Sequence, residues 1–86
     1  MFYLEQYLRG HYRSPICVQG FKTYKGAKKH IEKWGFKAQR SDYVIRDENN
    51  TILCNAHYEE AEKCVLFTEM DNIGRIENQF KVFERA

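Results

Sequence analysis

The chain has 86 residues, a length that suits one domain and excludes an enzyme with a cleft between two lobes. Hydrophobic residues make up 43% of the sequence and aromatic residues 15%, which is enough for one small core without a metal or a disulfide. The formal net charge of +2 hides a basic half, with nine bases and three acids in residues 1–43, and an acidic half, with five bases and nine acids in residues 44–86. We therefore treat residues 1–86 as a single domain whose halves either neutralise each other or present their charges to a partner.

The first two elements are predicted to be strands. Residues 2 to 9 alternate between two sides and are rich in aromatics, which favours a strand, although Tyr3, Leu4, Tyr7 and Leu8 would also share one face of a helix. After a loop over residues 10–15, a short apolar run at 16–18 predicts a second strand, antiparallel to the first.

The clearest predicted element is a helix over about residues 24–34, with Thr23 as its N-cap and Gly35 as its stop. Its apolar stripe consists of Tyr24, Ala27, Ile31 and Trp34, and its basic stripe of Lys25, Lys28, Lys29 and Lys33. We expect the apolar stripe to pack on the sheet, with the two aromatic residues in the core rather than as platforms for nucleic-acid bases.

Residues 43–56 predict a hairpin with a type I′ turn at Asn49-Asn50. Pairing outward from that turn sets Cys54 opposite Ile45 and Leu53 opposite Arg46. The core face of the hairpin then carries Tyr43, Ile45, Ile52, Cys54 and Ala56.

The last third of the chain is harder to assign. Residues 64–68 favour a strand, although a helix through 58–70 also fits. Ile73, Ile76, Phe80 and Phe83 recur at helical spacing after a capping Asp71 or Asn72, which predicts a C-terminal helix over about 72–84. The predicted fold is therefore α+β: a mostly antiparallel sheet of four to five strands with two helices.

Catalytic motifs are absent from the sequence. It contains no glycine-rich phosphate loop, no HExxH and no nucleophile elbow, so we expect no enzyme and no cofactor. Cys17, Cys54 and Cys64 could each meet one of the three histidines (His11, His30 and His57) as a nucleophile pair, so a cysteine-dependent enzyme stays a third hypothesis. The Cys54-x-x-His57 spacing is an unsuitable metal site, because residues an odd number apart on a strand point to opposite faces.

Binding is the predicted role, and two groups of residues are its candidates. A basic segment over 22–40 could contact nucleic acid or an acidic partner, unless it is only a solvated face: Lys22, Lys25, Lys28, Lys29, Lys33, Lys37 and Arg40. Aromatic and acidic residues could contact a protein, unless a second helix covers the tyrosines: Tyr3, Tyr7, Tyr12, Tyr58, Glu59, Glu60 and Glu62.

From these groups we expect a non-catalytic protein that docks on a partner protein, as small regulators or inhibitors from phages and mobile elements do. We expect that partner to be a protein that itself handles nucleic acid. The alternative is direct, sequence-nonspecific binding of nucleic acid through residues 22–40. A homo-oligomer is compatible with the sequence, but no feature indicates one.

The expected location is the cytoplasm. The N-terminus lacks the features of a signal peptide, no 18 consecutive residues are apolar, and three cysteines are an odd number that does not suit a disulfide framework.

Overall fold

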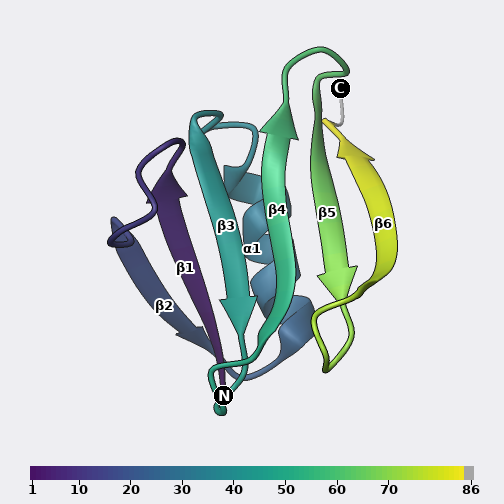
Figure 1. The fold of residues 1–86 in the computed structure, drawn as a ribbon. Helices are drawn as coiled ribbons and strands as arrows, with labels where there is room; N and C mark the ends of the chain where they lie inside the picture. Colours follow the sequence, from purple (N-terminus) through teal and green to yellow (C-terminus); the bar gives the residue numbers. More distant parts are fainter. Residues whose placement is uncertain (85–86) are drawn as a thin grey trace.

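The computed structural model describes residues 1–84 and shows a six-stranded antiparallel sheet with one helix against one face (Figure 1). The elements in chain order are β1 (Phe2–Leu8), β2 (Cys17–Phe21), α1 (Tyr24–Trp34), β3 (Ser41–Arg46), β4 (Ile52–Glu59), β5 (Cys64–Met70) and β6 (Ile76–Phe83). In space the strands lie in the order β2-β1-β3-β4-β5-β6, so β2 and β6 form the two edges. The predicted strand at residues 2–9 and the predicted helix at 24–34 are confirmed.

The predicted α+β class, with four to five strands and two helices, is wrong. The segment predicted as a C-terminal helix is β6, because the residues before it form a hairpin turn. The Asp71 carboxylate accepts hydrogen bonds from the backbone N–H groups of Ile73 and Arg75, at 3.0 and 2.9 Å, and Gly74 adopts a φ of 83°. The Phe80 ring then stacks on Phe67 of β5, with centroids 4.8 Å apart. The helical spacing in this segment was therefore coincidental.

The hairpin of β3 and β4 is confirmed in most of its register, but its turn differs from the predicted type I′. Ile45 lies opposite Cys54 as expected, whereas Arg46 lies opposite Ile52 because the register shifts between residues 45 and 46. Asn50 has a positive φ of 65° and Asn49 does not, so the mirror-image turn is not formed. The Asp47 carboxylate instead accepts hydrogen bonds from the backbone of Asn49 and Thr51, at 2.9 and 3.0 Å.

Residues 58–70 form strands rather than a helix. Strand β4 continues to Glu59, and a turn that contains Lys63 in the left-handed region, with φ 55°, leads into β5. The acidic residues Glu60 and Glu62 lie in this turn.

The helix begins as predicted, since the Thr23 hydroxyl accepts a hydrogen bond from Gly26 N–H at 3.0 Å. The helix also ends at Gly35 as predicted, but glycine is needed there for packing rather than for its backbone conformation. Its φ of −58° needs no glycine, but a β-carbon there would lie 2.7 Å from Val65 Cγ2. Gly35 therefore lets the end of the helix approach β5 closely.

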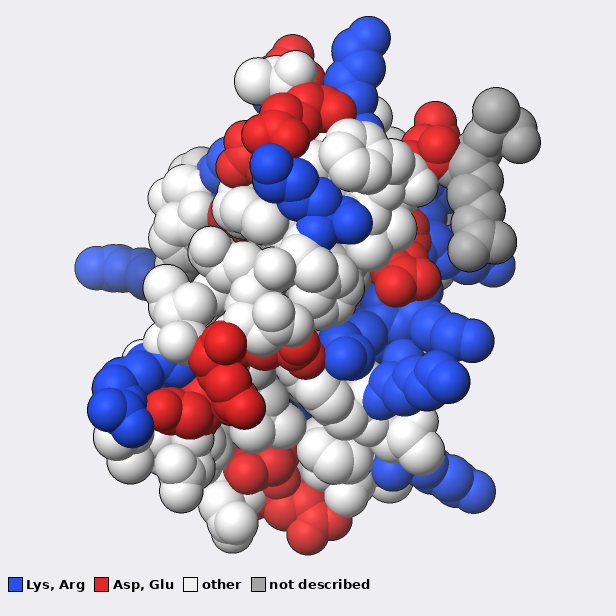
Figure 2. Space-filling model, turned by 90° about the vertical axis from the view of Figure 1, so that its right-hand side faces the viewer, with Lys and Arg blue, Asp and Glu red and all other residues white. Residues whose placement is uncertain are grey.

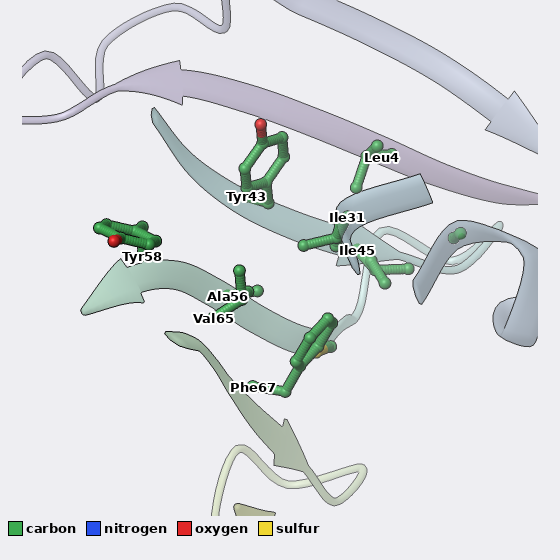
Figure 3. Close-up of a cluster of buried hydrophobic side chains, with 10 residues drawn as sticks. Leu4, Ile31, Tyr43, Ile45, Ala56, Tyr58, Val65 and Phe67 are labelled. Atoms are coloured by element: carbon green, nitrogen blue, oxygen red, sulfur yellow. The ribbon is translucent and has the colours of Figure 1, made fainter. Parts of the chain in front are cut away.

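The core lies between α1 and the face of the sheet that it covers (Figure 3). Its fully buried side chains include Ile31, Tyr43, Ile45, Val65 and Phe67. In residues 1–84 no helix packs on the second face, which we call the open face. By strand alternation and register the open face carries Tyr3, Glu5, Tyr7, Asp42, Val44, Arg46, Asn55, His57, Leu66 and Thr68.

Candidate functional site

The basic residues in positions 1–84 divide into those that form ion pairs within this part of the chain and those that do not. Five of the 13 Lys and Arg residues between positions 1 and 84 form ion pairs, namely Arg9, Lys28, Arg46, Arg75 and Lys81. Six of the other eight fall between positions 22 and 40, and we call them the cationic surface: Lys22, Lys25, Lys29, Lys33, Lys37 and Arg40. In Figure 2 basic side chains gather on the right, which is the side of the molecule where α1 covers the sheet. At the cationic surface, therefore, the acidic half of the chain does not neutralise the basic half.

Lys28 does not belong to this surface, and the description of α1 as a basic helix fits the structure poorly. Its ammonium lies 3.1 Å from the Glu69 carboxylate and 4.5 Å from the centroid of the Tyr24 ring. The side chain is about three-quarters buried, because α1 directs it at β5 rather than at solvent. The unpaired cations extend instead from Lys22, before the helix, to Arg40, in the loop that follows it.

Three polar side chains bind the carboxylate of Glu69 beneath α1. Its carboxylate accepts hydrogen bonds from Tyr24 Oη at 2.6 Å, Lys28 Nζ at 3.1 Å and Asn78 Nδ2 at 3.1 Å. Burial alone would raise the pKa of Glu69, but these donors outweigh it and hold the pKa below its ordinary value. Burial and the bond to Glu69 raise the pKa of the Tyr24 hydroxyl, so it remains a donor. This cluster fixes α1 to β5 and β6.

Trp34 is exposed, contrary to the prediction that it lies in the core. Its exposed fraction is 40%, because Ala27 and Ile31 occupy the centre of the buried stripe and Trp34 lies at the margin. The ammonium groups of Lys37 and Lys33 lie 4.9 and 5.8 Å from the centroid of the indole ring. The only tryptophan of the chain is thus a half-open aromatic surface flanked by two unpaired cations.

His30 extends this aromatic surface toward β2. Its ring lies 6.0 Å from Trp34 and 5.3 Å from Phe21, measured between centroids. Burial, and to a smaller extent Lys33, lower the pKa of His30, so the ring is neutral at neutral pH. The positive charge around Trp34 therefore comes from the lysines.

A groove of about 790 Å³ runs between α1 and β6, whereas the aromatic surface of Trp34 and His30 extends toward β2. Lys29, Lys33, Lys37 and Lys81 line it, with Phe36, Val82 and Phe83 as its apolar residues and Glu32 and Glu84 as its acids. Lys81 is held by Glu62, with Nζ 2.7 Å from Oε2. Lys37 thus borders both the groove and the Trp34 ring.

The open face contains a smaller hollow of about 360 Å³, whose polar lining includes Tyr7, Tyr12, Asp42, Arg46 and His57. Its charges are paired within the face: Arg46 Nε lies 2.7 Å from Glu5 Oε1, and Asp42 accepts hydrogen bonds from Arg9 and Tyr12. Tyr7 also donates to Glu5, at 3.0 Å. This hollow is therefore nearly neutral and differs in kind from the cationic surface.

The residues predicted to contact a protein do not form one patch. Tyr7 and Tyr12 lie side by side, with ring centroids 6.1 Å apart, and Tyr3 is exposed on the same face. Tyr58 is 8% exposed and belongs to the core. Glu59 lies 2.6 Å from His57 Nε2, Glu62 is bound to Lys81, and Glu60 is exposed in the turn. The sequence does not predict this hollow, because the contact between Tyr12 and Asp42 depends on the conformation of the loop that carries Tyr12.

The thiols show no arrangement for catalysis in the described part of the chain. Cys54 is fully buried, and this burial raises its pKa to about 11. Burial also raises the pKa of Cys64, while Cys17 is exposed on β2. Among residues 1–84 no hydrogen bond joins a cysteine to a histidine, and no group of three or more His, Cys, Asp or Glu side chains could hold a metal ion.

Comparison with known proteins gives no match: no protein-family model fits the chain, no curated protein matches it, and no solved structure matches its fold. Among residues 1–84, the single helix is too short and too polar to cross a membrane.

Proposed function

We propose that this protein acts without catalysis and binds single-stranded nucleic acid, sequence-nonspecifically, through the cationic surface. The observation that carries the proposal is Trp34, which is exposed between two lysines that have no ion pair within residues 1–84. From the sequence this function was the alternative to docking on a protein. Because Trp34 is exposed, we rank nucleic-acid binding above docking on a protein.

Lysines and an aromatic ring supply the two interactions that unpaired strands need. Lysine ammonium groups bind phosphates as point charges and release counterions, and they carry little base readout. An exposed indole stacks on any base, which is worth about 1–3 kcal/mol per base and is available only where the base is unpaired. Lys33 and Lys37 lie within 6 Å of the ring centroid, so a base on Trp34 would have its phosphates near both.

Trp34 also provides the test, because as the only tryptophan it reports on this surface directly. Oligothymidylate of about 12 nucleotides, within the usual range of single-strand site sizes, is titrated into the protein at low salt while indole fluorescence is followed. We expect saturable quenching, and weaker binding of a duplex of the same length. An unchanged fluorescence together with no shift in a native gel would contradict the proposal.

A matched pair of double variants separates the surface from net charge. Lys29→Glu/Lys33→Glu reverses two charges of the cationic surface, and Arg13→Glu/Lys63→Glu reverses two exposed charges elsewhere. Both change the net charge by the same amount. The first should lower the affinity at least tenfold more than the second, with equal melting temperatures. Equal losses of affinity in the two double variants would mean that binding depends on net charge and not on the cationic surface.

A partner protein is the second candidate, and the paired charges of the open face favour it. Interface cores are depleted in unpaired charge and enriched in Tyr and Arg, as the hollow around Tyr7, Tyr12 and Arg46 is. The test is purification of a tagged protein from its native host. A stoichiometric partner that Asn55→Arg releases and Lys29→Glu/Lys33→Glu retains would support this candidate.

The proposed location is the reducing cytoplasm. Three free cysteines support it, two of them fully buried and on opposite faces of the sheet.

A further inference from the structure

Strand β2 is a free edge of the sheet. Among residues 1–84 it pairs only with β1, on its inner side, and Figure 1 shows no other described segment beside its outer side. The backbone groups on that outer side are open to pairing with another strand, which natural proteins usually prevent with charges, prolines or bulges.

Strand β2 itself carries no charge and no proline, since the one proline nearby, Pro15, lies two residues before the strand begins. From Ser14 to Phe21 no side chain is charged, and residues 17–20 of the strand are exposed. The opposite edge strand, β6, carries Glu77 and Lys81. Only one of the two edges is thus guarded by charge.

Exposed apolar side chains cluster at the same end of the sheet. Six of the ten large hydrophobic residues that are exposed belong to residues 1–18, and β3, β4 and β5 contribute none. Ile16 and Val18 are 63% and 56% exposed, and Tyr3 lies on the neighbouring strand at 41%. Contact with another strand would remove this apolar area from water.

We infer that β2 pairs antiparallel with β2 of a second copy of this chain, which joins two six-stranded sheets into one. A two-fold axis brings each strand against its own copy, and the uncharged segment 14–21 sets no like charges opposite each other. The pairing also closes, because both β2 edges are consumed and the outer edges of the dimer are the two charged β6 strands.

Two matched edge variants test the pairing by sedimentation and light scattering. Val18→Lys places a charge on β2, and Ile76→Lys makes the corresponding change at a similarly exposed position of β6. We expect the wild type and Ile76→Lys to approach twice the monomer mass as concentration rises toward the millimolar range, and Val18→Lys to remain monomeric. A monomeric wild type would overturn the inference. A mass that keeps growing with concentration would also overturn it, because it indicates that β2 of one copy pairs with β6 of the next.

A distance measurement keeps the inference testable if Val18→Lys fails to fold. Cys17 is exposed whereas Cys54 and Cys64 are buried, so a nitroxide spin label reacts at one site of the wild type. Strands about 4.8 Å apart put the two Cys17 positions roughly 5–20 Å from each other in a β2-to-β2 dimer, but about 50 Å apart in a β6-to-β6 dimer. The longer distance would overturn the proposed pairing.

Discussion

Lys28 and Lys29 are neighbours in the sequence and have opposite environments in the fold. Lys28 lies between α1 and β5, in an ion pair with Glu69 at 3.1 Å, whereas Lys29 is exposed beside the groove at β6 and has no ion pair in residues 1–84. The inner side of α1 uses charge to hold the helix on the sheet. Its outer side leaves charge free for a ligand, so stability and binding should respond to different residues.

The largest effect is expected from Glu69→Ala, which removes the acceptor of the inner cluster. Tyr24, Lys28 and Asn78 lose their common partner, and we expect the free energy of unfolding to fall by about 2–3 kcal/mol. Urea denaturation measures it. Glu77→Ala, on exposed β6, is the control and should have little effect. The affinity of Glu69→Ala for nucleic acid should not decrease. A loss as large as that from Lys29→Glu/Lys33→Glu would mean that the inner side of α1 also contributes to binding.

Acid should weaken the same cluster. Because the pKa of Glu69 lies below the ordinary value of 4.5, its contribution to stability is complete above that value and is lost as the pH falls through the lower, native pKa. Stability measured from pH 6 downward should therefore fall more steeply for the wild type than for Glu69→Gln. Parallel curves would mean that the carboxylate charge does not hold the helix.

Salt tests the outer side. With about four phosphates contacted, the affinity for a single strand should fall as roughly the 2.8th power of salt concentration, or about 50-fold for a fourfold increase. Fluorescence titrations of Trp34 at several salt concentrations give this slope. Lys29→Glu/Lys33→Glu should flatten it, while Arg13→Glu/Lys63→Glu should not. A slope near zero in the wild type would exclude phosphate contacts as the source of affinity.

The stacking contribution should be smaller than the effect of salt. Trp34→Ala is expected to reduce the affinity about tenfold, equivalent to one stacked base, and to leave the melting temperature nearly unchanged because the ring is 40% exposed. Native gels at low salt measure the affinity, since this variant lacks the indole. Trp34→Phe should retain most of it. Equal losses from both variants would point to a structural role for the ring.

Local patterns predicted the elements whose signals lie within a few residues. Thr23 and the apolar stripe determined α1, and strand alternation determined β1. The same reasoning gave a C-terminal helix, because Ile76 and Phe80 are four residues apart; β6 forms instead because Gly74 takes a positive φ and β5 offers an open edge with Phe67. Whether this segment forms a helix or a strand therefore depends on β5, whose own sequence also fits a helix.

The site depended on contacts across the sequence. The helical pattern put Lys28 with the other lysines, and only Glu69, 41 residues later, removes it from them. Trp34 lies at the end of the apolar stripe, where a small tilt of the helix decides between core and surface. No local signal reports that tilt, so the basic segment was visible in the sequence while its aromatic centre was not.

The smallest effects give the most direct comparison of the two sides. Lys28→Met should lower the free energy of unfolding by about 1 kcal/mol, because a partly buried ion pair is lost, and should leave the affinity unchanged. Lys29→Met should leave stability unchanged, lower the affinity about threefold and reduce the salt slope by about 0.7. The two substitutions are chemically identical and adjacent, so a difference in either readout comes from position alone. If both variants weaken binding equally, Lys28 leaves Glu69 when nucleic acid binds, and the inner pair is then part of the binding surface.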